Sequence, residues 1–128
     1  MSKGKIEGLA HIGIFVKDME ASIGYYKKLG FTLDKEESFG NLELAFLSAG
    51  TCLIELVKPE EYSKRVAGPI DHIAVVVDDI EAAVANACAN GINIDASKIA
   101  FAPVLGGIRN VFFEGPDGER IEFMEYPK

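Results

Sequence analysis

The stretch His11-Ile12-Gly13-Ile14-Phe15-Val16-Lys17-Asp18-Met19-Glu20-Ala21 recurs later in the chain as His72-Ile73-Ala74-Val75-Val76-Val77-Asp78-Asp79-Ile80-Glu81-Ala82. The correspondence extends to Gly30 and Gly91, and seven of the 21 positions aligned between 11–31 and 72–92 are identical. A repeat of this length in a 128-residue chain indicates two copies of one supersecondary unit. Because each copy opens on one of the two histidines, the repeat predicts that pseudo-two-fold symmetry brings the two imidazoles face to face.

Composition and charge narrow the class of protein. With 48% hydrophobic and 26% charged residues, residues 1–128 are expected to form a single domain with an ordinary core. The net charge of −7 disfavours nucleic acid and anionic membrane as partners, since both require a basic face. No apolar run reaches the roughly 18 residues that cross a membrane, and no secretory signal follows Met1. Cys52 and Cys88 lack CxxC spacing and are interpreted as buried, reduced thiols, so a cytoplasmic location is expected.

The periodicity of apolar residues predicts the same order of elements in both copies. In module one, about 5–58, a helix begins at the Asp18 cap and ends at Gly30. Its strands are expected at 6–16, 31–37, 42–48 and 51–58, and the proline-bounded segment 59–69 is expected to be a linker.

Module two, about 70–126, repeats this order. Its helix is expected from the Asp79 cap to Asn90-Gly91, and its strands at 70–77, 92–95, 109–114 and 119–125. The stretch 96–108 shows no clear period and is predicted to be a loop and a candidate lid. Each module therefore has the order βαβββ.

The last strand of each module carries a glutamate between apolar residues. Leu53-Ile54-Glu55-Leu56 corresponds to Arg120-Ile121-Glu122-Phe123, and each follows a glycine turn. Burying a carboxylate is costly unless it is paired or metal-bound. One such glutamate alone, or one histidine on an apolar strand, is more often structural. The matched set of four favours a metal site formed by His11, Glu55, His72 and Glu122. Two neutral imidazoles and two carboxylates make an N2O2 donor set whose charge a divalent cation neutralises.

At this point the chain resembles the vicinal oxygen chelate superfamily, which includes glyoxalase I and the bleomycin-resistance proteins. The resemblance covers essentially all of the chain. It rests on the run from His11 to Val16, on Ser22 and Tyr25-Tyr26-Lys-Lys-Leu-Gly-Phe31, and on the ending Phe113-Glu-Gly-Pro-Asp-Gly-Glu-Arg-Ile-Glu-Phe. It implies an α+β fold in which two tandem βαβββ modules form a cupped, mostly antiparallel sheet around a metal. It also implies the same four ligands, with Ni²⁺, Co²⁺ or Zn²⁺ expected before Mn²⁺ or Fe²⁺.

The resemblance implies a metal-dependent lyase or isomerase of the glyoxalase I (lactoylglutathione lyase) type. Such an enzyme moves a proton alpha to a carbonyl through an enediolate, and the resemblance assigns Glu122 as the base. Phe15 and Pro59 replace the arginine and asparagine with which glyoxalase I holds glutathione, so another thiol carrier is expected. Phe15 and Arg109, which follows Gly106-Gly107, are the substrate-binding candidates, although Arg109 could equally be a surface residue.

Two alternatives stay open. In a methylmalonyl-CoA or other acyl-CoA epimerase, Glu43 would be a second catalytic acid or base, although a solvated glutamate is the simpler interpretation of this residue. The other alternative is a non-catalytic protein of the bleomycin-resistance type that sequesters its ligand. The expected partners are a small molecule, either a hemithioacetal or an acyl thioester, and a second copy of the chain in a homodimer. Whether the metal site lies within one chain or across that dimer is also open.

Overall fold

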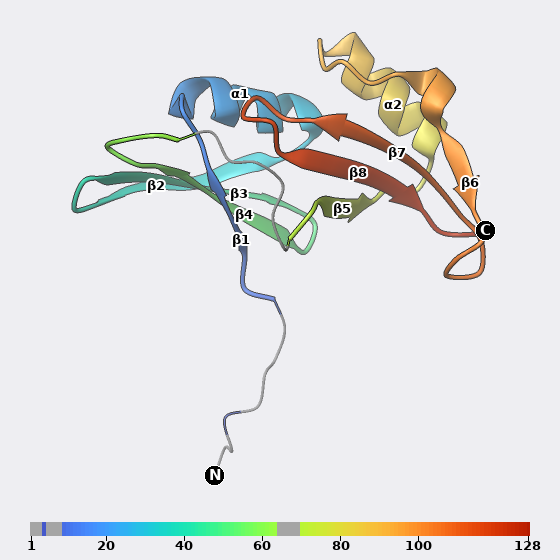
Figure 1. Cartoon of the computed structure of the whole chain (residues 1–128), viewed down its shortest axis with the longest axis horizontal. Coiled ribbons are helices and arrows are strands. Elements are labelled where there is room, and N and C mark those ends of the chain that lie inside the picture. Colours follow the sequence, from blue (N-terminus) through green and yellow to red (C-terminus); the bar gives the residue numbers. More distant parts are fainter. Residues whose placement is uncertain (1–3, 5–8, 64–69) are drawn as a thin grey trace.

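The computed structural model describes residue 4 and residues 9–63 and 70–128, which form two helix-covered sheets (Figure 1). In the first module, strand order in the sheet is β1-β4-β3-β2, with β1 parallel to β4 and the other pairs antiparallel. The elements of this module are β1 (Ile12–Phe15), α1 (Met19–Leu29), β2 (Thr32–Phe39), β3 (Leu42–Ala49) and β4 (Cys52–Lys58). The βαβββ order predicted for this module is confirmed, although β1 is shorter than the strand expected at 6–16, of which 6–8 lie outside the described residues.

The second module repeats this topology, with strand order β5-β8-β7-β6 and a parallel β5–β8 pair. Its elements are β5 (Ile73–Val76), α2 (Ile80–Ala89), a 3₁₀ turn η1 (Ala96–Lys98), β6 (Ala100–Ala102), β7 (Ile108–Glu114) and β8 (Arg120–Glu125).

Two predictions for the second module were wrong. No strand forms at 92–95, where Ile92 and Ile94 are buried core residues outside any strand. The segment 96–108, expected to be a loop, contains η1 and β6 instead. The apolar residues at 92–95 suggested a strand because they indicated burial. A side chain can, however, be buried without its backbone pairing in a sheet.

Asp18 and Asp79 begin the two helices as predicted, because each carboxylate accepts a hydrogen bond from the backbone N–H three residues later. Gly30 ends α1 with a left-handed φ of 118°, a conformation that residues with a Cβ rarely adopt. Figure 1 shows both helices along the same side of the molecule, so each sheet has one face covered by a helix and one face without such cover.

The core lies between each sheet and its helix. In the first module it contains Ala45, Leu47, Ile54 and Leu56 from the strands, together with Tyr26 from α1. In a strand, alternate side chains point to opposite faces. Residues one position away from these, including Glu55, therefore lie on the face that no helix covers. The second module follows the same rule, because Val111, Phe113, Ile121 and Phe123 are buried and Glu122 alternates with the last two.

The two modules are joined where α1 meets the turn between β7 and β8. Asp117, in this turn, accepts a hydrogen bond from the Lys17 N–H at 3.1 Å and one from the buried Ser22 hydroxyl at 3.5 Å. Tyr26 donates to Glu119 at 3.0 Å, and Tyr25 donates to the Glu114 carbonyl at 3.2 Å. Burial first, and then the Glu119 carboxylate, raise the pKa of both tyrosines, so both hydroxyls stay protonated donors.

Cys52 and Cys88 are free thiols. Cys88 is exposed rather than buried as predicted, and Cys52 is half-buried. Cys88 is located near the end of α2, where its thiol donates to the Ile94 carbonyl. Among the residues that the structure describes, no helix combines the length and the apolar character needed to cross a membrane.

Candidate functional site

In the first module, His11 and Glu55 form a pair on the face of the sheet opposite α1. Because β1 runs parallel to β4 and Gly13 is in register with Glu55, the histidine just before β1 reaches the glutamate in β4. His11 Nε2 lies 3.5 Å from Glu55 Oε1, and the ring packs edge-on against Phe46. Gly13 leaves open space beside the carboxylate, because a Cβ at this position would lie 3.7 Å from Oε1.

The second module forms the equivalent pair from His72 and Glu122. His72 Nε2 lies 3.2 Å from Glu122 Oε1, and Ala74 occupies the register position that Gly13 has in the first module. Glu122 is only 5% exposed. The side-chain amide of Asn110 donates to its other oxygen, Oε2, at 2.9 Å. Oε1 of this buried carboxylate is therefore directed toward the histidine.

Asp71 contacts the opposite side of the His72 ring. Its Oδ2 lies 2.8 Å from His72 Nδ1 and 2.6 Å from a guanidinium nitrogen of Arg120. The hydrogen bond from His72, and then that from Arg120, lower the pKa of Asp71, so this side chain is an ionised acceptor. An ionised carboxylate can only accept hydrogen bonds, so Nδ1 must carry the proton when this bond is made.

This arrangement fits a divalent metal ion. When Nδ1 of His72 carries its proton, the neutral ring presents a lone pair at Nε2 toward an oxygen of Glu122. Two acceptors that face each other at 3.2 Å require a cation or a proton between them. A metal-ligating histidine whose second nitrogen donates to a carboxylate is a common arrangement in metalloproteins.

One chain does not combine the two pairs into a single cluster. The structure brings His11 to Glu55 and His72 to Glu122. Within the described part of the chain, however, no group of three or more histidine, cysteine or acidic side chains is close enough to hold a metal ion. Each pair therefore supplies half of the predicted N2O2 set.

Glu43, the predicted second acid or base, lies away from both pairs. It is in register with Lys58, and its carboxylate pairs with the Lys58 amine at 2.9 Å. Phe46 is in register with Glu55 in the neighbouring strand, so these two side chains share a face. Glu43 is separated from Phe46 by an odd number of positions in β3, so Glu43 and Glu55 lie on opposite faces of the sheet. The solvated, ion-paired glutamate is the arrangement observed.

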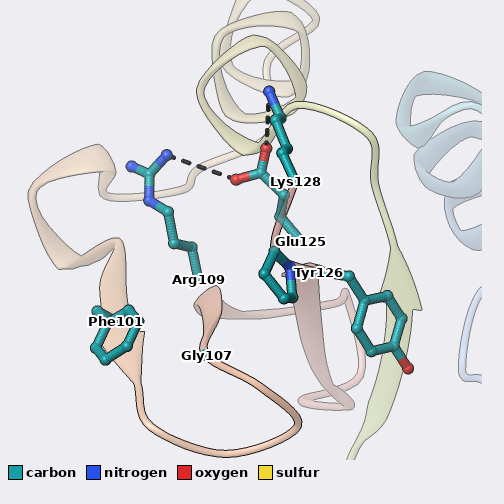
Figure 2. A pocket seen from close by; sticks show the side chains of 7 residues that line it. Phe101, Gly107, Arg109, Glu125, Tyr126 and Lys128 are labelled. Atoms are coloured by element: carbon teal, nitrogen blue, oxygen red, sulfur yellow. Dashed lines mark ion pairs between the residues drawn. The ribbon is translucent and has the colours of Figure 1, made fainter.

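Arg109, a predicted substrate residue, lies on the face of the second sheet that α2 covers. Its guanidinium makes a two-pronged ion pair with Glu81 of α2. It also lies 3.5 Å from the buried carboxylate of Glu125 (Figure 2). Lys128 approaches the other oxygen of Glu125 at 3.6 Å. Arg109, Glu125 and Lys128 line a pocket together with Phe101 and Gly107. This pocket faces away from Glu122, because Glu125 and Glu122 point to opposite faces of β8.

Phe15, the other predicted substrate residue, shares the face of Gly13 and Glu55. It is 41% exposed, and Phe112 and Val76 on the corresponding face of the second sheet are also exposed. Both His/Glu pairs therefore lie beside partly exposed apolar side chains.

Sequence reasoning missed three polar residues around Glu122, namely Asp71, Asn110 and Arg120. Asn110 is two residues from Phe112, the register partner of Glu122, so strand alternation could have placed it on the same face once the β7–β8 register was known. Arg120 lies two residues before Glu122 in β8 and could have been found by the same rule.

Comparisons with known proteins agree with this architecture. A family model described as the Glyoxalase/Bleomycin resistance protein/Dioxygenase superfamily matches residues 8–123. The uncharacterized protein YwbC of Bacillus subtilis (strain 168) is 36% identical over 121 residues, which covers 90% of this chain and 94% of YwbC.

Solved structures show the same fold. A glyoxalase family protein from Enterococcus faecalis superposes with a TM-score of 0.79 at 25% identity, over 93% of this chain and 98% of that protein. The E144Q mutant of glyoxalase I from Zea mays superposes with a TM-score of 0.74 at 24% identity, over 89% of this chain but 43% of the maize protein.

Proposed function

This chain belongs to the Glyoxalase/Bleomycin resistance protein/Dioxygenase superfamily, and on that premise we propose that it is a cytoplasmic, metal-dependent enzyme of the glyoxalase I type. The proposed reaction is transfer of a proton at a carbon alpha to a carbonyl, as in lactoylglutathione lyase. The observation that carries this proposal is the repeated pair, in which a histidine Nε2 faces a glutamate oxygen on the same face of each sheet.

The proposed metal ligands are His11, Glu55, His72 and Glu122. A divalent ion held by them would stabilise the negative charge that develops on the oxygen of the substrate. Ni²⁺, Co²⁺ and Zn²⁺ suit two imidazoles and two carboxylates, since all three accept mixed nitrogen and oxygen ligands. The overall charge of this donor set is −2, which a divalent cation neutralises.

Glu122 is the residue that we propose as the general base. Its carboxylate is buried, so a proton that it takes up from a substrate would be shielded from exchange with bulk water. Asn110 occupies only one of its two oxygens. The remaining oxygen, Oε1, faces the open side of the sheet beside His72. A base must lie within hydrogen-bond reach of the proton that it removes, and a substrate bound on the uncovered face would present its proton to this oxygen.

A second copy of the chain would complete the metal site. Each pair supplies two ligands and lies on an open face with exposed apolar side chains, so a two-fold partner could place its second-module pair opposite the first-module pair. Such a dimer would form two identical sites and would cover Phe15 and Phe112. The proposed assembly is therefore a homodimer with each site shared between chains.

The substrate would be a small molecule of the hemithioacetal or acyl thioester class. Phe15 on the site face offers an apolar contact and cannot pair with a carboxylate of glutathione. Among acyl thioesters, an epimerase that uses Glu43 is disfavoured, because Glu43 lies on the other face of the sheet and pairs with Lys58. We therefore propose the isomerase chemistry with a thiol other than glutathione.

The proposal is tested by loading purified protein with Ni²⁺, Co²⁺ or Zn²⁺ and following two substrate panels. One panel contains methylglyoxal hemithioacetals of several thiols, and the other contains acyl-CoA thioesters in deuterated solvent. Isomerisation in the first panel supports the glyoxalase I type. Deuterium incorporation in the second panel alone would establish the epimerase instead, and stoichiometric metal without turnover in either panel would favour a ligand-sequestering protein.

A further inference from the structure

The two His/Glu pairs occupy matching places in the repeat but have different surroundings. The strand registers match Asn110 of the second module with Leu44 of the first, and Arg120 with Leu53. At the offset of the repeat, Asp71 corresponds to Ala10. The polar groups that surround the second pair are therefore replaced by apolar side chains around the first.

In the second module, four side chains form a closed ring of contacts. Asp71 bridges His72 and Arg120 through one oxygen, at 2.8 and 2.6 Å. The guanidinium of Arg120 stacks on Phe112, with 4.0 Å from its central carbon to the ring centroid. Phe112 in turn packs edge-on against His72, with 5.3 Å between ring centroids and an angle of 88°. Each member of this ring restrains the next.

The consequence for His72 concerns both the orientation and the proton of its ring. Rotation of the ring is opposed by Phe112 on one side and by the Asp71 hydrogen bond on the other. Because Asp71 accepts a hydrogen bond at Nδ1, the proton of the neutral ring must be on Nδ1. Nε2, without a proton, is then directed at Glu122 Oε1. Outer groups of this kind orient a ligand and raise its basicity, and their loss usually costs about 10–100-fold in metal affinity.

We propose that Asp71, held by Arg120, is a positioning residue that fixes the ring and the protonated nitrogen of His72, and so pre-orients the second-module pair for a divalent ion. The first pair has no such support within the described residues. His11 packs more loosely against Phe46, with 6.3 Å between ring centroids, and the Glu55 side chain is more exposed than that of Glu122, at 20% against 7%. The metal part of this inference rests on the function proposed above, but the state of the His72 ring does not.

The ring nitrogens of the two histidines are measured by ¹⁵N NMR of the full-length protein, without metal and with Zn²⁺. Because His11 and His72 are the only histidines, His11→Ala assigns both spectra. In the metal-free protein at about pH 8, where ordinary imidazoles are neutral, Nδ1 of His72 should carry a proton. Asp71→Ala should increase the population protonated at Nε2 alone, and it should leave the His11 signals unchanged.

The dissociation constant for Zn²⁺, measured against a competing chelator, gives the second readout. Asp71→Ala should weaken Zn²⁺ binding about 10–100-fold. Asp71→Asn keeps an acceptor oxygen without the charge and should lose less affinity, and Arg120→Met, which frees Asp71, should fall between the two variants. Asp34→Ala removes an exposed carboxylate from β2 and is the matched control for the change in net charge, with no change expected in either readout.

Two results would overturn the inference. One is a wild-type His72 that is protonated at Nε2 and bare at Nδ1. The other is an Asp71→Ala variant with an unchanged His72 spectrum and unchanged Zn²⁺ affinity. A wild-type protein that binds no divalent ion would instead refute the proposed function, while the spectra would still decide whether Asp71 positions the ring.

Discussion

The hydroxyl of Tyr26 donates a 3.0 Å hydrogen bond to the carboxylate of Glu119, and this contact joins the helix of one module to the β7–β8 turn of the other. Tyr26 is 2% exposed, so the bond is shielded from water. The same turn leads into β8, which contains Glu122, so the junction between the modules also sets the position of the His72/Glu122 pair relative to α1.

Tyr26→Phe should therefore destabilise the protein by about 1.5–3 kcal/mol, the usual loss for a hydrogen bond to a charged group. Tyr25→Phe is the matched control, because it removes a 3.2 Å bond from a half-buried hydroxyl to a backbone carbonyl and should cost about 0.5 kcal/mol. Urea unfolding of both variants measures the difference. Equal losses would show that Glu119 contributes nothing specific to the junction.

Replacement of either histidine should abolish stoichiometric metal. His11→Ala and His72→Ala each remove one of the four proposed ligands, whereas Glu43→Gln changes a carboxylate on the opposite face of the sheet. Elemental analysis should find one divalent ion per chain in the wild type and in Glu43→Gln, and little in either histidine variant. Full metal content in His72→Ala would show that the ligand set is wrong.

The homodimer and the sharing of its sites are tested together. Light scattering should give twice the 13.9 kDa of one chain. If each site takes its two pairs from different chains, mixing unfolded His11→Ala and His72→Ala chains and refolding them should restore one intact site in each mixed dimer. The metal content should then recover to roughly a quarter of the wild-type value, given random pairing of chains. No recovery would place all four ligands in one chain, since every chain in the mixture lacks one histidine.

Glu122→Gln should slow turnover by about 10²–10⁴-fold, the usual contribution of a general base. The amide keeps an oxygen that can contact the metal but cannot accept the substrate proton. Exchange of solvent deuterium into a substrate from the panel above reports the proton step directly, and Glu43→Gln should retain wild-type exchange. If Glu122→Gln exchanges at the wild-type rate, the base must be Glu55 or another group.

The ion pair between Glu81 and Arg109 should make stability depend on pH. The guanidinium lowers the pKa of Glu81, so the folded protein holds this carboxylate ionised more strongly than the unfolded chain does. The stabilisation is present above the ordinary pKa of a glutamate and disappears as the pH falls through the lower folded value. Glu81→Gln should therefore lower the urea midpoint at neutral pH and match the wild type in strong acid.

Glu20→Gln is the control for that measurement. Glu20 also lies in the first turn of a helix, and the described residues give it no arginine partner. Its effect on the urea midpoint should be smaller than that of Glu81→Gln. A pH-independent difference between Glu81→Gln and the wild type would mean that the carboxylate charge is not what stabilises the contact.

The sequence by itself determined the two modules, their helix caps and the four candidate ligands. These features depend on local periodicity and on the repeat, because Asp18, Asp79 and Gly30 act within one turn of their own helices. The identity of His11, Glu55, His72 and Glu122 as a matched set required only alignment of the two copies. That information is carried by residue order and does not need the packing of distant segments.

Only the tertiary structure decided the faces and the partners. Glu43 and Glu55 are on opposite faces of the sheet because of the register between β3 and β4. Arg109 forms an ion pair with Glu81 because α2 packs on the face of the second sheet on which Arg109 lies. The separation of the two His/Glu pairs within one chain likewise depends on how the modules pack through α1 and the β7–β8 turn. These are contacts between segments far apart in the sequence, and local pattern carries no signal for them.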